Sequence, residues 1–401
     1  MKKFFMLMAA VIILLTAMTG TAFGADAASI KEAPDIKIVM EGSLTTYKNV
    51  PVSVNGNNLL PLREMLVNLG VPNDDEHIIF NSKEQSVTII SEQTTILLNI
   101  GETTAYVNNS PVTLNAAPVL YNNSTYIPVR FVAEALDKKV VWDGSTRTVF
   151  ISDRARFESI EQLLKKSNEA AAKADKYKMK MDINAVSGTG ALKFTIGVKA
   201  DAAVDKPGKK MYMEMLVDML GAEVNSDTYF ADNKSYAVNP ITGEWEKKTY
   251  TDKEYEQLFQ AQTNVNSIKA EEAMCAGLVQ KESANADEIV LRGDVYLADL
   301  FKNALAQQNS VMGTDTAENP PRFDTCNLQM VLDKNTFLLK SLDMKVSAEE
   351  NNNGQKVTTD ITVITNFSDY NGDFNISVPD DILQGAVETK PDAGDGGSGK
   401  F

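Results

Sequence analysis

Two stretches of the chain repeat the same order of apolar and polar positions. In each, a proline opens a run in which apolar residues recur at i, i+3, i+4 and i+7, the spacing of one buried helix face. Two short β-prone runs follow, "HIIF" and "SVTII" in the first stretch and "VVW" and "TVFI" in the second. The pattern predicts a duplicated unit of one helix and one hairpin. The matching positions are Leu62, Met65, Leu66 and Leu69 in the first copy and, 67 residues later, Val129, Val132, Ala133 and Leu136 in the second.

Beyond residue 154 the pattern becomes that of a large sheet. A polar segment rich in alanine and lysine over 155–176 predicts a helix, and from Tyr177 onward apolar and polar residues alternate in strand after strand. Helical segments at about 252–262 and 297–308 interrupt the strands. Two long strands close the pattern, with "DKNT" and "EENNNGQ" as hairpin turns. The predicted fold class is α+β.

The N-terminal segment predicts export. Two lysines, an apolar run and a set of small residues make 1–27 typical of a secretory signal peptide. No later run reaches the ~18 apolar residues of a membrane span, so we expect a secreted, extracellular protein with no transmembrane segment after cleavage. Association with the cell wall stays open. The expected division of the mature chain is 28–154, a linker helix or first helix of the next domain at 155–176, a β-rich domain at 177–385 and a disordered tail at 386–401.

The duplicated unit resembles a known small domain. "LPLRE" in the first copy, and "YIPVRFVAEAL" followed by "VVWDGSTRTVFI" in the second, are similar to the copper amine oxidase-like N-terminal domain over residues 36–152. The resemblance implies a small twisted antiparallel sheet with packed helices, a stalk module found in secreted proteins of Gram-positive bacteria. It does not imply oxidase activity. Copper of that type needs several imidazole ligands, and His77 is the only histidine, so we expect no copper and no cofactor.

A second resemblance covers residues 158–383. The order of a leading helix, long strands and helical interruptions, ending in "FSDYNGDFNISVPDDI", is similar to secreted relatives of the LolA and LppX lipoprotein carriers. It implies a large curved antiparallel sheet, or an open β-barrel, with a helical lid over an apolar cavity. It also implies binding of a lipid, another hydrophobic ligand, or a partner polypeptide such as a cell-wall or envelope protein.

Methionines mark the candidate wall of that cavity. Met211, Met213 and Met215 alternate in "KKMYMEM", and Met179 and Met181 alternate in "KMKMD", so each set shares one strand face. An ordinary core face is the simplest interpretation. The second is a pliable wall for a hydrophobic ligand, and the third is a thioether site for Cu(I).

Charge and cysteine content narrow the partners and the chemistry. A formal net charge of −15 and a pI of about 4.7 argue against nucleic acid as a partner, because its backbone is itself negative. Cys275 and Cys326 form a candidate disulfide in an exported chain. Two buried or free thiols are the alternative.

The sequence has no recognised catalytic pattern. It has no Gly-x-Ser-x-Gly, no phosphate loop and no His-Glu-x-x-His, and one histidine leaves little room for a triad. "DYNGDFNISVPD" loosely resembles a calcium loop, but Phe374 stands where glycine is needed, and a turn at Asn371 and Gly372 explains it better. The predicted function is therefore an exported, non-catalytic binding protein in which a stalk carries a domain for a hydrophobic ligand or partner. The alternative is an extracellular enzyme: an unrecognised hydrolase, or an amine oxidase, which the histidine count opposes.

Overall fold

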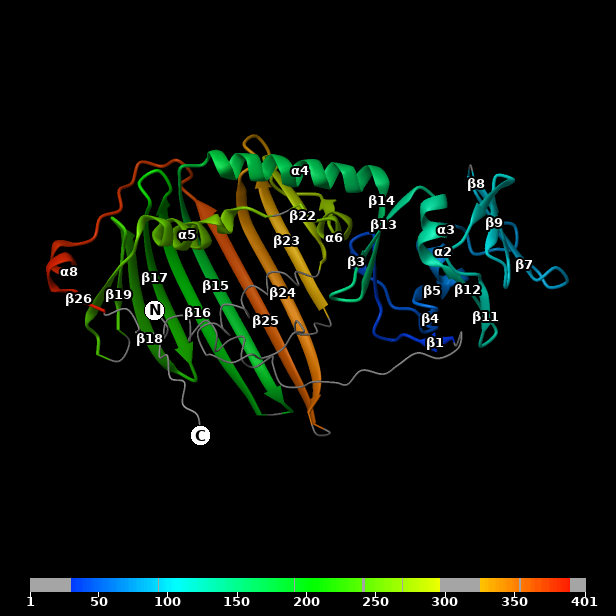
Figure 1. Cartoon of the computed structure of the whole chain (residues 1–401), viewed down its shortest axis with the longest axis horizontal. Coiled ribbons are helices and arrows are strands. Elements are labelled where there is room, and N and C mark those ends of the chain that lie inside the picture. Colours follow the sequence, from blue (N-terminus) through cyan, green and yellow to red (C-terminus); the bar gives the residue numbers. More distant parts are fainter. Residues whose placement is uncertain are drawn as a thin grey trace, which may run out of the picture.

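Three small sheets precede one large sheet along the chain (Figure 1). The computed structural model describes residues 30–92, 94–190, 192–239, 242–268, 270–295, 325–352 and 355–389. The predicted α+β class is confirmed by this mixture of long antiparallel strands and separate helices. The predicted signal peptide at 1–27 and the predicted helix at 297–308 lie outside the described residues.

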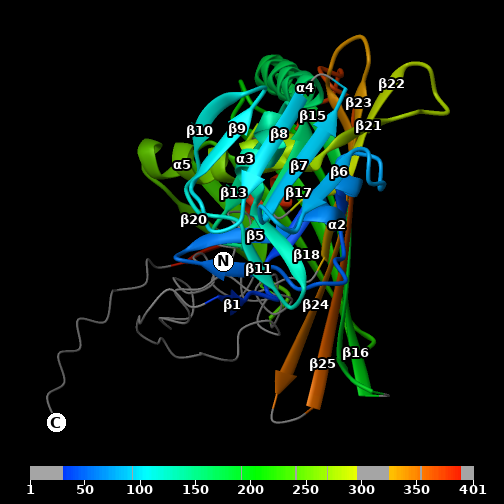
Figure 2. The same ribbon diagram turned by 90° about the vertical axis from the view of Figure 1, so that its right-hand side faces the viewer.

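The three small sheets use residues 31–153 and stand in front of the large sheet in Figure 2. Their strand orders are β1-β4-β5-β12-β11, β10-β9-β8-β7-β6 and β13-β14-β2-β3. The strands are β1 (Lys31–Glu32), β2 (Lys37–Met40), β3 (Ser43–Leu44), β4 (Val52–Val54), β5 (Asn57–Pro61), β6 (Ile78–Asn81), β7 (Ser86–Ser91), β8 (Thr94–Asn99), β9 (Thr104–Val107), β10 (Ser110–Thr113), β11 (Val119–Tyr121), β12 (Ser124–Pro128), β13 (Lys138–Asp143) and β14 (Thr148–Asp153).

The predicted duplication is confirmed and is longer than the sequence indicated. Helix α2 (Leu62–Asn68) with hairpin β6–β7 matches helix α3 (Val129–Ala135) with hairpin β13–β14. A further hairpin precedes each helix, β4–β5 in the first copy and β11–β12 in the second, with all bounds shifted by 67 residues. After the helices the shift falls to 62, because the connection in the first copy is five residues longer.

The two copies are related by a local two-fold axis. β5 and β12 pair antiparallel with Tyr126 opposite Pro61, Ile127 opposite Leu60 and Pro128 opposite Leu59. Exchanging the copies reproduces the same pairs, so the axis passes between Leu60 and Ile127. Both residues are fully buried, so the duplication lets the copies bury their central strands against each other.

Local sequence explains why each helix starts where it does. Pro61 and Pro128 precede the first helical residue with nearly identical backbone angles, φ −58° and ψ 118° against φ −60° and ψ 112°. The predicted apolar stripes face the core: Met65, Leu66, Val132 and Ala133 are all fully buried. These packed stripes supply the stability that a seven-residue helix lacks alone.

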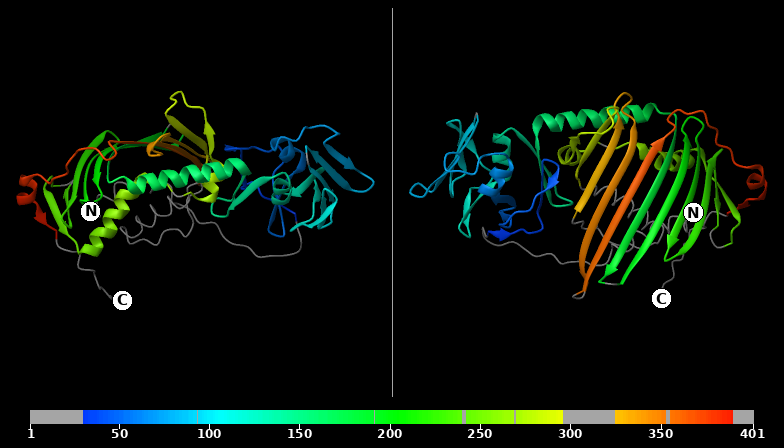
Figure 3. Two further views of the ribbon diagram at one scale, coloured as in Figure 1. Left: turned by 90° about the horizontal axis from the view of Figure 1, so that it is seen from above. Right: turned by 180° about the vertical axis from the view of Figure 1, so that it is seen from behind.

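The large sheet has twelve strands in the order β21-β22-β23-β24-β25-β15-β16-β17-β18-β19-β20-β26. Viewed from above it is bent into a trough, with helices α4 and α5 on the concave side (Figure 3). Its strands are β15 (Lys176–Thr189), β16 (Leu192–Asp205), β17 (Lys210–Met219), β18 (Ala222–Ala231), β19 (Lys234–Val238), β20 (Trp245–Thr249), β21 (Val279–Lys281), β22 (Glu288–Asp294), β23 (Thr325–Asp333), β24 (Leu339–Asn352), β25 (Gln355–Ser368) and β26 (Val387–Glu388).

Helix α4 (Arg154–Lys173) follows β14 without an intervening loop. The Asp153 side chain caps it by accepting a hydrogen bond of 3.1 Å from the backbone N–H of Arg156. Its buried residues include Phe157, Ile160 and Leu164, which pack in the core of the large sheet. The other helical segments are α5 (Asp252–Thr263), η1 (Asn264–Asn266), α6 (Glu272–Gly277) and α8 (Asp380–Gly385).

Within the described residues, none of the helices is both long and apolar enough to cross a lipid bilayer. At the other end of the chain, β26 lies in the segment predicted as a disordered tail, and it pairs with β20 through Glu246 and Val387. The tail from 390 onward is outside the described residues.

The small sheets join the large one through direct backbone contact. The Asp294 carboxylate accepts a hydrogen bond of 2.6 Å from the Leu44 N–H, and the Asp294 N–H donates to the Gly42 carbonyl at 2.9 Å. At Gly293, a Cβ would lie 1.9 Å from the Gly277 carbonyl oxygen and 3.1 Å from that of Gly42. Glycine is therefore required where β22 packs against the end of α6, next to Gly42. Val39, Val141 and Phe150 from the N-terminal part belong to the same core cluster as the large sheet.

Candidate functional site

The concave face of the large sheet carries rows of apolar side chains. The Tyr177 hydroxyl donates a hydrogen bond of 2.5 Å to the Thr263 carbonyl at the end of α5. Tyr177 therefore faces the helices. Residues at alternate positions of β15, among them Met179 and Met181, share that face. The intervening residues, such as Lys180, point to the opposite side, where Lys180 forms an ion pair with Asp201.

Strand pairing places the five predicted methionines in three neighbouring rows of this face. Cross-strand partners point the same way, so the register defines each row. The rows are Tyr177–Val204–Met211–Phe230, then Phe367–Met179–Ala202–Met213–Thr228, then Thr365–Met181–Ala200–Met215–Ser226. Small alanines separate the methionines within the second and third rows. The sequence pattern had indicated only that each set shares a face, and the pairing brings both sets together.

Burial differs along these rows. Met211 and Met215 are each 2 % exposed and belong to the core cluster, whereas Met179, Met181 and Met213 are half-buried and pack against it. An unbranched thioether side chain adapts to irregular surroundings. The half-buried methionine side chains can therefore change conformation to fit a neighbouring group, whereas the fully buried ones are held in place by the surrounding core.

Two buried polar side chains beside these rows have unsatisfied hydrogen-bonding atoms. Thr228, opposite Met213, is 4 % exposed, and its hydroxyl has no partner among the described residues. Asn266 in η1 is 1 % exposed, and neither atom of its amide has one. It lies beside Tyr370 but out of hydrogen-bond geometry. An unpaired buried polar group is costly, so each of these atoms lacks a hydrogen bond that its burial calls for. The alternating pattern could have indicated Thr228; nothing in the sequence indicates Asn266.

Aromatic rings close the end of the concave face under the helices. The Tyr177 ring centroid lies 6.1 Å from that of Phe367 and 6.0 Å from that of Tyr370. The Tyr370 hydroxyl donates to the Leu339 carbonyl at 2.8 Å. Burial raises the pKa of both tyrosines well above the usual value, which keeps the phenols neutral. In Figure 1 the long strands β15, β16, β24 and β25 extend well past the helices toward the other end of the sheet.

The two cysteines lie in this core but are not joined by a disulfide. Cys275 in α6 and Cys326 in β23 are both 0 % exposed and belong to the same apolar cluster. Burial raises the pKa of Cys275 to about 12, so its thiol stays protonated and unreactive near neutral pH.

Comparison with known families covers both parts of the chain. The model of a family of unknown function, DUF6612, matches residues 159–387, which is more than half of the sequence. The chain belongs to this family. A copper amine oxidase N-terminal domain matches residues 39–151, which confirms the resemblance carried by the repeated unit. No curated protein matches the chain.

Solved structures that match about half of the chain include a mycobacterial lipoprotein and a LolA superfamily protein. Lipoprotein LppX from Mycobacterium tuberculosis is 8 % identical, with coverage of 55 % of this chain and 99 % of that chain and a TM-score of 0.29. LprF from Mycobacterium bovis is 13 % identical, with coverage of 55 % and 97 % and a TM-score of 0.31. A LolA superfamily protein from Nitrosomonas europaea is 10 % identical, with coverage of 56 % and 96 % and a TM-score of 0.18.

In this DUF6612 protein, the residues considered as metal ligands contact other residues of the chain. His77 lies near the surface, with its Nδ1 2.8 Å from the Asp74 carboxylate. Asn371, in the segment that loosely resembles a calcium loop, accepts a hydrogen bond of 2.8 Å from the Asp175 N–H through its side chain. No group of three or more His, Cys, Asp or Glu residues in the described ranges is arranged to hold a metal ion.

Proposed function

We propose that this chain is an exported binding protein whose large sheet holds a hydrophobic ligand with one polar group along its concave face. The observation that carries the proposal is the set of methionine rows next to the unpaired hydroxyl of Thr228. Half-buried methionines accommodate chains of varied shape, and the hydroxyl supplies one polar contact. In this proposal the copper amine oxidase N-terminal domain is a stalk, and the protein performs no catalysis.

A charge placed in the methionine rows tests the apolar half of the proposal. The purified full chain should bind a hydrophobic reporter dye saturably, and palmitate should displace the dye. Met213→Glu should weaken dye binding by about tenfold or more, because an unpaired charge in an apolar wall costs several kcal/mol. Leu220→Glu is the matched control, since Leu220 lies in the turn that follows the same strand and is 76 % exposed; it should bind the dye like the wild type.

The opposite result would identify the rows as plain core. In that case the native wild type would ignore the dye, and Met213→Glu would lower the free energy of unfolding by several kcal/mol. The large sheet would then have a scaffold or partner-binding role.

Replacing the unpaired hydroxyl tests the polar half. Thr228→Val keeps the shape of the side chain and should raise the free energy of unfolding of the ligand-free chain by about 1 kcal/mol, because it removes an unsatisfied buried group. It should leave dye binding unchanged and weaken palmitate binding severalfold. Equal palmitate affinity in wild type and Thr228→Val would show that the hydroxyl does not contact the ligand.

A further inference from the structure

The duplication in the N-terminal part creates two equivalent grooves. The first has a volume of about 750 Å³ and runs beside α2; the second, of about 580 Å³, runs beside α3. Each is formed by the helix start and strand pair of one copy together with the hairpin turn of the other copy. The local two-fold axis therefore exchanges the grooves, and most lining residues of one have a counterpart in the other.

Each groove has an exposed aromatic ring at the same position. Phe80 pairs with Val87 across β6 and β7, and Trp142 pairs with Val149 across β13 and β14. The two aromatic side chains are 47 % and 38 % exposed, which is unusual for large apolar residues. Because both copies keep a ring at the groove wall, the position points to a role beyond packing.

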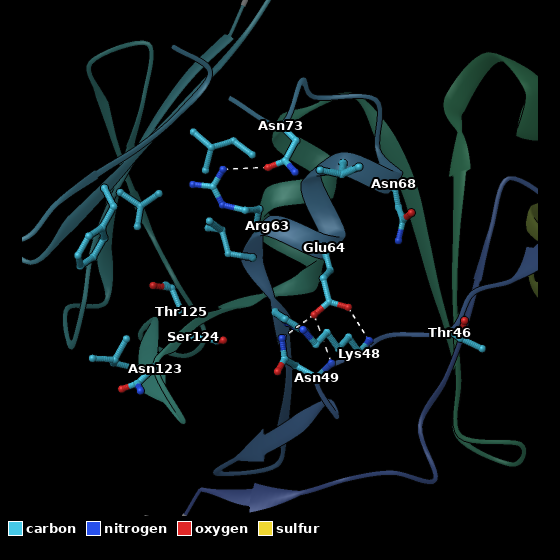
Figure 4. Close-up of a pocket in the computed structure, with 17 residues that line it drawn as sticks. Thr46, Lys48, Asn49, Arg63, Glu64, Asn68, Asn73, Asn123, Ser124 and Thr125 are labelled. Atoms are coloured by element: carbon cyan, nitrogen blue, oxygen red, sulfur yellow. Dashed lines mark hydrogen bonds between the residues drawn. The ribbon is translucent and has the colours of Figure 1, made fainter. Parts of the chain in front are cut away.

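Polar side chains surround each ring. Arg63 and Arg130 occupy the second position of the two helices, and Thr46 and Thr113 are also equivalent. In the first groove Asn123, Ser124 and Thr125 lie on the same side of α2 as Arg63 (Figure 4). The second groove has Gly56, Asn57 and Asn58 at the corresponding positions. Hydroxyl and amide groups both donate and accept hydrogen bonds.

Two charged side chains of the first groove, Glu64 and Arg63, already have partners within the protein. Glu64 accepts hydrogen bonds from the Lys48 and Asn49 backbone N–H groups at 2.6 and 3.2 Å, and Arg63 donates to the Asn73 side chain at 2.9 Å (Figure 4). In the second groove Arg147 pairs with Asp35 at 2.5 Å. Together with the net charge of −15, this arrangement disfavours a polyanionic ligand and favours a neutral one.

We infer that the two grooves are paired binding sites for a neutral glycan. A sugar ring has an apolar face of C–H groups that stacks on an aromatic ring, and hydroxyls at its edge that match amide and hydroxyl side chains. A polymer of repeating sugars also accounts for two sites of the same design on one small unit. This inference concerns the N-terminal part alone and is independent of the ligand proposed for the large sheet.

Calorimetry with the full chain tests the inference directly. The probes are the neutral hexasaccharides of β-1,4-glucose, α-1,4-glucose and β-1,4-N-acetylglucosamine, with an inorganic polyphosphate as the polyanion. At least one hexasaccharide should bind with two sites per chain, and the polyphosphate should not bind. Phe80→Ala and Trp142→Ala should each leave one site, and the double variant should leave none.

The repeat itself supplies the controls. Phe80→Trp installs the ring of the second copy in the first and should keep both sites, as should Trp142→Phe. Tyr106→Ala removes a ring that is 37 % exposed in the same part but lines neither groove, so it too should keep both sites. The rescue variants exclude loss of folding as the cause of lost binding.

Three results would overturn the inference. The first is that no neutral hexasaccharide binds the wild type. The second is that the double variant keeps both sites, or that Tyr106→Ala loses them as well. The third is that the grooves bind extended peptides and the double variant abolishes that binding, which would make them peptide sites.

Discussion

Tyr177 shows how one buried side chain links the helices to the sheet. It is 0 % exposed, its hydroxyl bonds the end of α5, and its ring contacts Phe367 and Tyr370. The Lys206 ammonium lies over the ring, 5.6 Å from its centroid. Deprotonating this phenol would place a negative charge in the apolar core, which explains the direction of its pKa shift.

The raised pKa of Tyr177 predicts alkaline sensitivity. A tyrosine whose pKa is higher in the folded state stabilises the fold fully below its unfolded pKa, near 10, and loses that contribution as pH rises toward the folded value. The free energy of unfolding, measured by urea titration, should therefore decline above pH 10. Tyr177→Phe should lower it by about 1 kcal/mol at pH 8 through the lost hydrogen bond and make the decline shallower by up to about 1.4 kcal/mol per pH unit. Tyr106→Phe should decline like the wild type, and an equally steep decline in Tyr177→Phe would contradict the assignment.

The cysteines give a second prediction at this scale. With both side chains fully buried and the pKa of Cys275 raised to about 12, neither thiol should react with iodoacetamide at pH 8 in the native protein. Mass spectrometry should find two alkyl groups after unfolding in guanidinium without reductant. Alkylation that requires a reductant as well would mean that the protein carries the disulfide considered from the sequence.

At the level of elements, the hairpin turns of the two copies depend on left-handed backbone. Asn55 and Gly56 have φ of 50° and 78°, and Asn122 and Asn123 have φ of 46° and 60°. These are the two consecutive positive angles of the tight turn that suits a two-residue hairpin. Each turn also lines the groove of the other copy, so turn geometry and groove shape are fixed by the same residues.

Replacing the turn glycine should destabilise the first hairpin. Nothing lies within 4 Å of a Cβ at Gly56, so Gly56→Ala acts through backbone angle alone and should cost about 1 kcal/mol of unfolding free energy. Gly385→Ala is the control, because Gly385 also has open space around its Cβ but lies in α8 without a positive φ; it should be neutral or slightly stabilising. Equal effects of the two substitutions, measured by thermal unfolding, would rule out the role of the turn.

Sequence patterns predicted the elements whose signals are local. The helical stripe around Met65 was sufficient to predict α2, and the strand alternation around Met213 was sufficient to predict β17. The patterns did not predict the pairing of β5 with β12, the short helix α6, or the contact of β26 with β20. These depend on partners far along the chain. For the same reason the sequence showed that Met213 shares a face with its neighbours, but not that Thr228 lies opposite it with an unpaired hydroxyl.

At the scale of the whole molecule, the small sheets and the large sheet pack against each other at a junction. Phe150 of β14 packs in the core of the large sheet, and Lys139 of β13 forms an ion pair of 2.9 Å with Glu272 of α6. The apolar cores therefore meet without a loop between them. The boundary expected near residue 154 marks a change of architecture, and it lies within a shared core.

Gly293 provides a test of the close packing of β22 against the end of α6, beside this junction. Gly293→Ala places a methyl group against the Gly277 backbone, which cannot move aside as a side chain can, and should lower the free energy of unfolding by about 1 to 3 kcal/mol. Gly197→Ala, in the middle of β16 with 3.8 Å to the nearest atom, should change it much less. Small-angle scattering should show a larger radius of gyration for Gly293→Ala only. If both variants matched the wild type, the close contact would not exist in solution.

The hydrogen bonds that join Gly42 and Leu44 to Asp294 also determine how the molecule responds to an applied force. When one end of a protein is fixed and the other is pulled, a flexible linker extends first and absorbs the motion. Here tension on the small sheets passes directly into β22, the second strand of the large sheet. The orientation of the trough relative to the small sheets is therefore fixed, and an external force would turn the two parts together.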